Sequence, residues 1–254
     1  MGRVIPIITI REQYVVKRTG FKPNTEIYVG DAFNTVKILS DLGADEILLI
    51  DITGESTNES KFPFLEKLAS VCTVPLGYGG GIRTSTIAQR IINLGFEKIA
   101  INSEFIFNPN LVKDCAEILG SQAVIGAVDY SAKHSKKVVF DPRSRKLRKR
   151  DPVNQVIMLE KFGCGEIVVT AVERENSWIG FDLELARTLT ANTSIPIILH
   201  GGMGSIEDLR QLFSQSECDA GIGSYTMFSH KLGGVAVNYP LNSRYTGEIT
   251  SWRD

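Results

Sequence analysis

The stretch LGADEILLIDIT, from Leu42 to Thr53, decides the fold, because it leads from a helix end into a short apolar strand and then recurs. About 120 residues later the chain reads FGCGEIVVTAVE, from Phe162 to Glu173, which aligns Glu46 with Glu166. Self-similarity at a fixed offset indicates that one structural unit is used twice. The sequence therefore predicts two related halves.

On both sides of these two repeated stretches, short runs of apolar and β-branched residues alternate with helix-like stretches along the chain. The eight predicted strands are VIPIITI from Val4, EILLIDI from Glu46, VPLGYG from Val74, KIAIN from Lys98, AVIGAVD from Ala123, EIVVTAV from Glu166, IPIILHG from Ile195 and DAGIGS from Asp219. Eight strands alternating with helices over 254 residues are typical of a closed parallel barrel. We predict an α/β fold, a single (βα)8 TIM barrel over 1–254, with half-barrels at about 1–120 and 121–240 and a tail at 241–254.

Four helix starts carry capping signals. Asp31 precedes AFNTVKILSDLG, Asn108 precedes PNLVKDCAEILG, and Asp182 precedes LELARTLT. Ser205 has Asp208 three residues later, which is the spacing of a capping box. We expect side-chain oxygens at these positions to accept hydrogen bonds from the first free backbone N–H groups of each helix.

Bulk composition limits the function classes. Hydrophobic residues make up 43% of the chain and charged residues 22%, which is globular usage. With 28 basic and 29 acidic side chains the net charge is −1, so no global field attracts nucleic acid or a membrane. The amino terminus has no signal-like apolar segment, and no 18 apolar residues run together. We expect a cytoplasmic protein that binds neither nucleic acid nor a membrane.

The cysteines argue against a metal site. Cys72, Cys115, Cys164 and Cys218 are widely spaced and form no CxxC pair. They also lack the His-rich neighbourhood that a zinc site needs. We expect buried free thiols, no metal and no cofactor.

Glycine pairs follow predicted strands at matching places in the two halves. Backbone N–H groups of a Gly-Gly pair can approach a phosphate closely, although such glycines also simply turn a strand into its loop. Repetition in register favours two related anion sites at the C-terminal ends of the strands, where barrel enzymes have their active sites. The residues predicted to bind an anionic, phosphorylated substrate are Gly80, Gly81, Asn102 and Ser103 in the first half and Thr170, Gly201, Gly202, Gly223 and Ser224 in the second.

These motifs resemble HisF, the cyclase subunit of imidazole glycerol phosphate synthase, from Arg3 to about Phe228. The motifs that carry the resemblance are VVK from Val15, GADEILLIDIT from Gly43, GGGIRT from Gly79, KIAINS from Lys98, GEIVVT from Gly165, GFDLEL from Gly180 and IPIILHGG from Ile195. The resemblance implies an enzyme related to histidine biosynthesis and built as two half-barrels. It also implies a HisH-type glutaminase partner at the N-terminal face of the barrel, whose ammonia passes through the barrel to the opposite end.

Four charges at predicted strand starts match the gate residues of that family: Arg3, Glu46, Lys98 and Glu166. Counting by twos from Glu166 leads to Thr170, so these charges share a face with residues expected to line the barrel interior. Two positive and two negative charges there would neutralise one another as a ring of salt bridges. The resemblance favours an ammonia gate, and a plug that only seals the barrel is the alternative.

The catalytic residues that the resemblance implies are partly missing. The family uses two aspartates as acid and base, but Thr9 stands where the counterpart of Asp129 is expected. A threonine hydroxyl can orient a substrate but is no base, so about 10²- to 10⁴-fold of general-base assistance is missing. Lys17 matches a mobile lysine that reaches over the substrate, or is a solvated loop lysine. His200 is a candidate general acid or base, or a structural hydrogen-bonding residue.

The second half of the predicted pocket departs further from the family. Where the family has an Asp-Gly-Thr turn, this chain reads ENSW from Glu175, and bulky Tyr225 follows Ser224. We expect a substrate that is altered at this end. The basic run from Lys133 to Arg150 is expected to form a hairpin that is either solvated or clamps a second anionic group, such as the diphosphate of a nucleotide sugar.

These departures favour a HisF-like synthase subunit that helps to amidinate a nucleotide-linked acetamido sugar for surface polysaccharide. The first alternative is the imidazole glycerol phosphate synthase cyclase itself. A related single-chain ribonucleotide isomerase ranks lower, because an enzyme that uses no ammonia has no need of a gate. The alternative from another class is a non-catalytic scaffold that activates the glutaminase.

Overall fold

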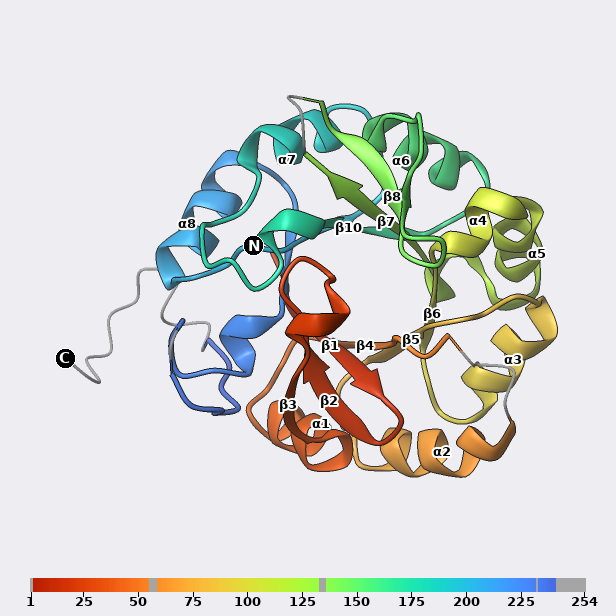
Figure 1. Ribbon diagram of the computed structural model, residues 1–254. Coiled ribbons are helices and arrows are strands. Elements are labelled where there is room, and N and C mark those ends of the chain that lie inside the picture. The colour runs from red at the N-terminus through yellow and green to blue at the C-terminus, as the bar shows by residue number, and fades with distance from the viewer. Residues whose placement is uncertain (1, 55–58, 133–135, 232, 241–254) are drawn as a thin grey trace.

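The computed structural model describes residues 2–54, 59–132, 136–231 and 233–240, so the predicted tail at 241–254 lies outside the described residues. Within them, eight parallel strands close a barrel, seen along its axis in Figure 1. The strands are β1 (Val4–Arg11), β4 (Ile47–Asp51), β5 (Leu76–Gly79), β6 (Lys98–Ile101), β7 (Val124–Ser131), β10 (Glu166–Ala171), β11 (Ile197–His200) and β12 (Asp219–Ile222). Neighbours pair in this order, and β12 returns to β1. The predicted TIM barrel is confirmed, with every strand end within two residues of its predicted place.

Helices form the outer ring of the barrel in Figure 1. They are α1 (Ala32–Asp41), α2 (Phe62–Ser70), α3 (Ser85–Asn93), α4 (Ser103–Phe107), α5 (Asn110–Leu119), α6 (Pro152–Lys161), α7 (Leu183–Thr190) and α8 (Ile206–Gln215). The predicted caps at Asp31 and Asp182 are confirmed, as is the capping box of Ser205 and Asp208. The predicted cap at Asn108 is wrong, because Asn108 ends α4 and the proline after it takes the N-cap position of α5.

Apolar side chains form two layers, because successive residues of a strand point to opposite faces. The outer layer, between strands and helices, includes Ile8, Leu49 and Val169. The inner layer fills the barrel and consists of Ile5, Ile7, Leu48, Ala100, Ile125, Ala127, Val168 and Ile198. Polar and charged side chains therefore collect at the two ends of the barrel, on either side of the inner layer.

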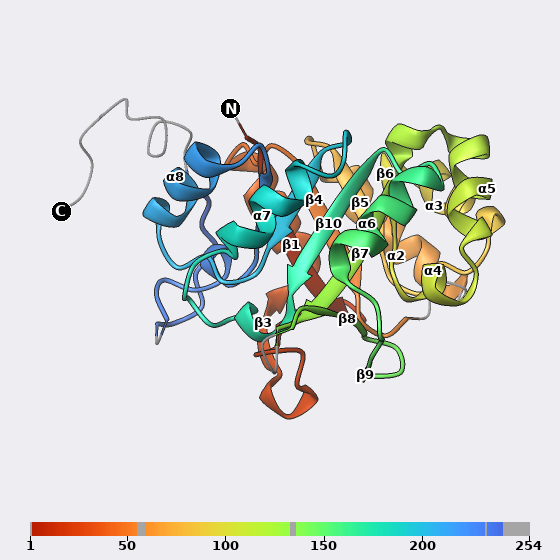
Figure 2. The ribbon, with the colours of Figure 1, turned by 90° about the horizontal axis from the view of Figure 1, so that it is seen from above.

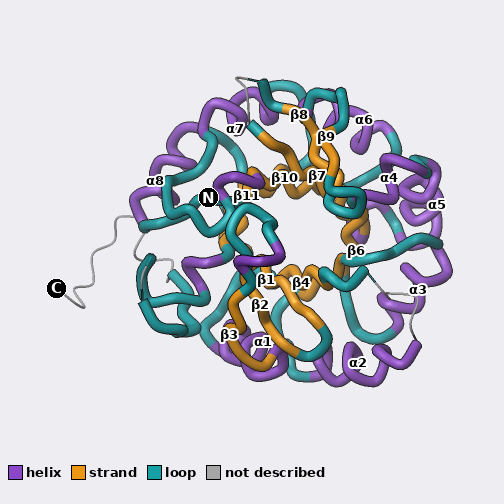
Figure 3. The backbone as a smooth tube through the Cα atoms, viewed as in Figure 1, coloured by secondary structure: helices purple, strands orange, loops and turns teal. Residues whose placement is uncertain are grey.

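Two antiparallel hairpins project from the C-terminal end of the barrel (Figure 2). β2 (Tyr14–Lys17) and β3 (Ile27–Asp31) extend from β1, and β8 (Val138–Asp141) and β9 (Lys146–Leu147) extend from β7. Figure 3 shows that loops gather over the ring of strands at this end. The hairpin expected in the basic run is present, and residues 133–135 of that run lie outside the described residues. The β2–β3 hairpin has no counterpart among the predicted elements.

The two halves repeat their backbone geometry after matching strands. Gly81 and Gly202 both have positive φ, 68° and 103°, and a Cβ at either would lie 2.1 Å from a backbone carbonyl oxygen. Only glycine fits such an approach. Asn102 (φ −116°, ψ −100°) and Gly223 (φ −111°, ψ −89°) also match, each before a short helix. This repetition agrees with a duplicated half-barrel.

Candidate functional site

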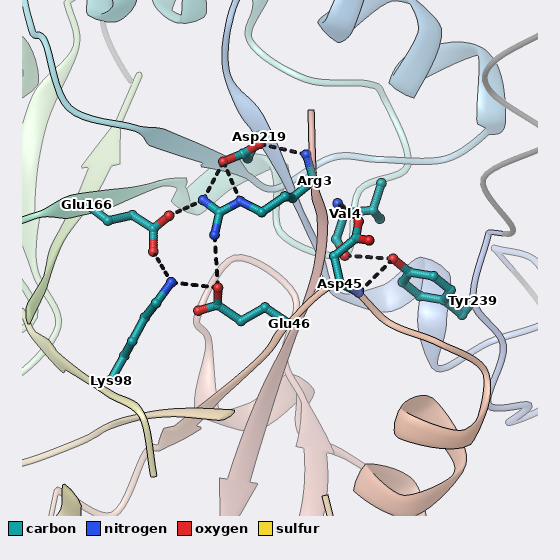
Figure 4. A network of polar contacts seen from close by, with 8 residues as sticks. All are labelled: Arg3, Val4, Asp45, Glu46, Lys98, Glu166, Asp219 and Tyr239. Atoms are coloured by element: carbon teal, nitrogen blue, oxygen red, sulfur yellow. Dashed lines mark hydrogen bonds and ion pairs between the residues drawn. The ribbon is translucent and has the colours of Figure 1, made fainter. Parts of the chain in front are cut away.

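Charged side chains meet at the N-terminal end of the barrel (Figure 4). Arg3 Nη1 lies 3.0 Å from Glu46 Oε2, and Arg3 Nη2 pairs with Glu166. Lys98 Nζ lies 2.6 Å from Glu46 Oε2 and 2.9 Å from Glu166 Oε2. The structure thus brings the four predicted charges into one ring of ion pairs.

A fifth charge, Asp219 at the start of β12, joins this ring, although the sequence patterns above did not single it out. Asp219 Oδ2 accepts a hydrogen bond of 3.0 Å from Arg3 Nε, and Oδ1 accepts one of 2.6 Å from the Arg3 backbone N–H. Three carboxylates therefore face two cations. Burial, together with the nearby charge of Glu166, raises the pKa of Glu46 despite its hydrogen bond from a lysine.

At the opposite end of the barrel, three neighbouring strands place polar side chains side by side. Thr170 on β10 is in register with Asp129 on β7 and with His200 on β11. Thr170 Oγ1 lies 3.2 Å from His200 Nδ1, and Asp129 is the register partner of Thr170 on the other side. Asn102, just after β6, donates from Nδ2 to Asp129 Oδ2 at 2.8 Å. A polar line thus crosses the mouth of the barrel.

Asp129 is suited to exchange a proton near neutral pH. Burial raises the pKa of its carboxyl group to about 7, although hydrogen bonds from Asn102 and Thr170 oppose the shift. The nearby charges of Glu175 and Asp141 act in the same direction as burial. A carboxyl group with this pKa can serve as acid or as base at physiological pH.

Thr9 and Lys17, at the same end of the barrel as Asp129, both have fixed hydrogen-bond partners. The Thr9 hydroxyl donates to the backbone carbonyl of Val16. Lys17, on β2, is fully buried, and its Nζ donates to Ile7 O at 3.3 Å and to Glu175 Oε1 at 3.1 Å. The interpretation of Lys17 as a solvated loop lysine is therefore wrong, because this side chain is paired inside the protein.

Glu175, in the loop after β10, is a second buried carboxylate at the mouth of the barrel. Its Oε2 lies 3.2 Å from His200 Nε2. Burial works to raise the pKa of Glu175, but the charge of Lys17 and its hydrogen bond outweigh burial and lower the pKa. Burial lowers the pKa of His200 to about 4, so the imidazole is neutral at pH 7. From sequence, Glu175 was noted only as a departure from the family.

The polar side chains of the first predicted anion site are already engaged. The Asn102 amide donates to the Asp129 carboxylate, as described above. Ser103 hydrogen-bonds Asp141. Although burial opposes the shift, hydrogen bonds from Ser144, Arg148 and Ser103 lower the pKa of Asp141 to about 2. An anion at this site would therefore contact backbone N–H groups of the glycine turn rather than the serine hydroxyl.

The second predicted anion site is a small pocket beside β12. Its lining includes Ser177, Trp178, Gly201, Gly202, Gly223 and Ser224. Among the described residues, the buried hydroxyls of Ser177 and Ser224 find no hydrogen-bond partner. The Trp178 ring lies 6.3 Å from the ring of Tyr225 at the rim. Buried hydroxyls without partners are ready to bind a polar group of a ligand.

The basic hairpin is partly neutralised by acidic neighbours. Arg143 Nη1 lies 2.8 Å from Glu104 Oε2, and its guanidinium lies 4.0 Å from the centre of the Phe107 ring. Arg148 pairs with Asp141. The basic side chains of the hairpin that remain exposed at its outer end are Arg145, Lys146 and Lys149.

The described residues offer neither a membrane-spanning helix nor a cluster of metal ligands. No helix there is long and apolar enough to cross a membrane. In that part of the chain, no three His, Cys, Asp or Glu side chains are grouped so that they could hold a metal ion. All four cysteines are free, and three of them are buried.

Comparison with known proteins places this architecture in a family. Residues 3–232 match the family model described as "Histidine biosynthesis protein". The chain is 34% identical over 246 residues to "Putative imidazole glycerol phosphate synthase subunit hisF3" of Vibrio vulnificus, covering 95% of this chain and 94% of the relative. It is 34% identical over 244 residues to the corresponding hisF2 protein of Pseudomonas aeruginosa, covering 94% and 95%.

A third relative, "Imidazole glycerol phosphate synthase subunit HisF" of Alkaliphilus metalliredigens, is 32% identical over 226 residues, which cover 87% of this chain and 88% of the relative. These matches run through both ends of the barrel, from the charged ring to the mouth that holds Asp129. The chain therefore belongs to the histidine biosynthesis protein family and, within it, to the HisF proteins.

Proposed function

We propose that the chain is a HisF-like synthase subunit that takes ammonia from a HisH-type glutaminase and helps to amidinate a nucleotide-linked acetamido sugar for surface polysaccharide. One observation carries the use of ammonia: the charged ring and Asp129 lie at opposite ends of a barrel whose inner layer is apolar. The relatives named as synthase subunits support a partner subunit that would dock at the N-terminal face.

The barrel interior favours ammonia over ammonium. Its inner layer consists of carbon side chains such as Ile5, Leu48 and Val168. An isolated ammonium ion is strongly disfavoured in such surroundings, whereas a small neutral molecule avoids that desolvation penalty. The charged ring at the entrance would then exclude bulk water and ions until the partner docks.

Thr9 supports an acceptor other than the one used in cyclisation. Cyclisation in this family is implied to need a carboxylate both at Asp129 and at the aligned position, where this chain has a hydroxyl that is bonded to the backbone of Val16. Amidination replaces the carbonyl oxygen of the acetamido group with nitrogen. The amidotransferase would activate that oxygen with ATP, ammonia would add to the carbon, and the activated oxygen would leave, with no proton transfer at a ring atom of the sugar. The altered position therefore favours amidination of an acetamido group.

The exposed parts of the mouth suit a nucleotide-linked sugar. Arg145, Lys146 and Lys149 offer positive charge for a diphosphate at the outer end of the hairpin. Ser177 and Ser224 offer hydroxyls, without partners among the described residues, for the hydroxyl groups of a sugar. Both features belong to the half of the site that departs from the family.

The second candidate is the imidazole glycerol phosphate synthase cyclase itself. The names of the relatives favour it, as does the retained pair of Asp129 and Asn102. Thr9 argues against it. A scaffold without chemistry is disfavoured, since it gives no reason for a buried carboxyl group with a pKa of about 7.

The test uses the full chain with its neighbouring glutaminase and amidotransferase, with ATP to activate the amide oxygen, and with glutamine labelled with ¹⁵N in its side-chain amide. A uridine-diphosphate N-acetyl sugar and the ribonucleotide of the histidine pathway serve as parallel probes. Label in an amidino sugar supports the proposal. Label in an imidazole product at about 1 s⁻¹ or faster selects the second candidate. If the chain neither binds the glutaminase nor stimulates its activity, the proposed use of ammonia is rejected.

A further inference from the structure

A line of buried polar side chains crosses the C-terminal end of the barrel. Asp129, Thr170 and His200 occupy adjacent register positions on β7, β10 and β11. Glu175 follows in the loop after β10, and Lys17 on β2 completes the line. All five side chains belong to residues that are at most 6% exposed. The line is therefore shielded from bulk solvent.

The spacing of these groups suits proton exchange. Asp129 and Thr170 are register partners on β7 and β10, and the Thr170 side chain acts on the Asp129 carboxyl group to lower its pKa. Thr170 Oγ1 lies 3.2 Å from His200 Nδ1. His200 Nε2 lies 3.2 Å from Glu175 Oε2. Among the described residues Nε2 has no partner with good hydrogen-bond geometry, so a small rotation of the ring would align it with Oε2. A hydroxyl and a neutral imidazole can each donate and accept at once.

We propose that Glu175 is the second carboxylate of the site and exchanges a proton with Asp129. Thr170 and His200 carry that proton between them. Asp129 is the catalytic residue, and the other three are positioning residues that act through it. This inference rests on the proposed function, because a proton partner for Asp129 matters only where ammonia chemistry takes place.

The transfer moves one proton and leaves the line otherwise unchanged. In the starting state Asp129 is protonated, His200 carries its proton on Nε2, and Glu175 is ionised. Asp129 gives its proton to Thr170 Oγ1, and the hydroxyl proton of Thr170 moves to His200 Nδ1. The Nε2 proton then moves to Glu175 Oε2. Asp129 is now a base, His200 is the Nδ1–H tautomer, and Glu175 is a carboxylic acid.

Neighbouring charges set the resting state of the line. Lys17 Nζ lies 3.1 Å from Glu175 Oε1 and, against the effect of burial, lowers the pKa of Glu175. Burial raises the pKa of Asp129 to about 7, and the charge of Asp141 on β8 adds to the shift. His200 is neutral because burial lowers its pKa to about 4. Below neutral pH the proton therefore resides on Asp129, and Glu175 is free to receive it.

Nitrogen-15 NMR of the free protein tests the line, because protonated and unprotonated imidazole nitrogens have different chemical shifts. In the wild type, the Nδ1 resonance of His200 should change with the midpoint of Asp129, near pH 7, as the Thr170 hydroxyl turns toward the new carboxylate. Thr170→Val removes the hydroxyl at similar volume and should abolish this change. The matched variant Thr170→Ser keeps the hydroxyl and should retain it. An equal change in Thr170→Val would overturn the proposal, because the charge of Asp129 would then act on His200 through space and not through the Thr170 hydroxyl.

Glu175→Gln tests the far end of the line. Glutamine has the same shape but takes up no proton, so the Nε2 resonance of His200 should shift and the pH-dependent change at Nδ1 should shrink. The double variant Lys17→Met/Glu175→Gln repeats the test without an unpaired lysine charge, which protects against loss of folding. Unchanged His200 resonances in both variants would remove Glu175 from the line. These spectra need no substrate, so a failure of ammonia transfer would reject the proposed function separately.

Discussion

Asp129 is buried with a pKa of about 7, which lies well above the ordinary value for an aspartic acid. Because the folded pKa exceeds the unfolded one, the folded state holds the proton more tightly, and stability falls as pH rises from about 4 to about 7. Asp129→Asn should therefore leave the free energy of unfolding unchanged near pH 4 and raise it at pH 8 by up to about 4 kcal/mol. Urea denaturation at both pH values measures the difference, and the same variant should abolish turnover.

Asp141 provides the control, because its pKa is shifted in the opposite direction, to about 2. A lowered folded pKa contributes stability above about pH 4 that is lost as pH falls toward 2. Asp141→Asn should therefore destabilise the protein at pH 8, where Asp129→Asn stabilises it. A loss of stability in both variants at pH 8 would contradict the assignment of a raised pKa to Asp129.

Thr9 gives a second prediction at the level of one residue. Thr9→Asp introduces the carboxylate that the cyclase reaction is expected to need. It also replaces the hydroxyl that donates to the Val16 carbonyl with a carboxylate, which cannot donate and is repelled by that oxygen. The lost bond and the repulsion should lower the free energy of unfolding by about 1–3 kcal/mol. Cyclisation of the histidine-pathway ribonucleotide with ammonium should rise only to a trace, because Trp178 and Tyr225 still crowd the second half of the site.

Thr9→Ser is the matched variant for this prediction. It keeps the hydroxyl that donates to the backbone, so its stability should stay near that of the wild type. Rates of cyclisation are read from product formation by the wild type and both variants. Turnover by the wild type at about 1 s⁻¹ would contradict the view that Thr9 limits the reaction.

At the level of elements, the segment between β2 and β3 is tied across the mouth of the barrel. Asn176 Nδ2 donates to Thr19 Oγ1 at 3.0 Å, and the ring of Phe21 packs edge-on against Phe140 of β8 at 6.2 Å. The double variant Phe21→Ala/Asn176→Ala should raise amide hydrogen exchange in residues 18–26 by about tenfold or more, since each contact contributes about 1 kcal/mol. Exchange is measured by mass spectrometry.

Asn192→Ala is the control for this prediction. Asn192 Nδ2 donates at 2.8 Å to Thr188 O at the exposed end of α7. Its loss should leave exchange in residues 18–26 unchanged. Equal exchange in wild type and in the double variant would mean that other contacts hold the segment, such as the hydrogen bond from Gly20 N–H to Glu175 O.

The strands and the mouth of the barrel could be predicted because their signals are local. Each strand is a short apolar run, and counting by twos identifies the inward face. Closure of the barrel then places Asp129, Thr170 and His200 side by side without further information. The β2–β3 hairpin could not be predicted in this way, because the segment 18–26 that links its strands is too long for a short-turn signal, although it contains Gly20, and because it is held by contacts with the loop after β10.

Sequence reasoning missed two residues of these sites, and only one of them needed information that the assembled molecule alone provides. Glu175 lies in a loop, and its role depends on Lys17 reaching it from a hairpin 158 residues away in the sequence. Asp219 could have been found, because aligning Asn102 with Gly223 places Lys98 on Asp219. In the alignment of the two halves, a cation in the first half therefore corresponds to an anion in the second half.

The charged ring is where the whole molecule is expected to meet its partner. Lys98→Met removes the cation shared by Glu46 and Glu166 and leaves three carboxylates with Arg3 alone. Their repulsion should disrupt the ring and lower the free energy of unfolding by up to about 3–5 kcal/mol. Glutamine-dependent turnover should then fall, whereas turnover with ammonium salts should persist, because ammonia from solvent reaches Asp129 directly at the mouth.

The ratio of glutamine-dependent to ammonium-dependent turnover is the measurement, since a loss of folding lowers both rates and leaves their ratio unchanged. Glu46→Gln gives a milder test, because it keeps the shape of the side chain and removes one charge from the ring. Lys113→Met, near the start of α5 and away from the N-terminal face, removes an exposed lysine outside the ring and should leave the ratio at the wild-type value. If Lys98→Met and Glu46→Gln also leave the ratio unchanged, the ring only seals the barrel. Ammonia would then have to arrive by another route.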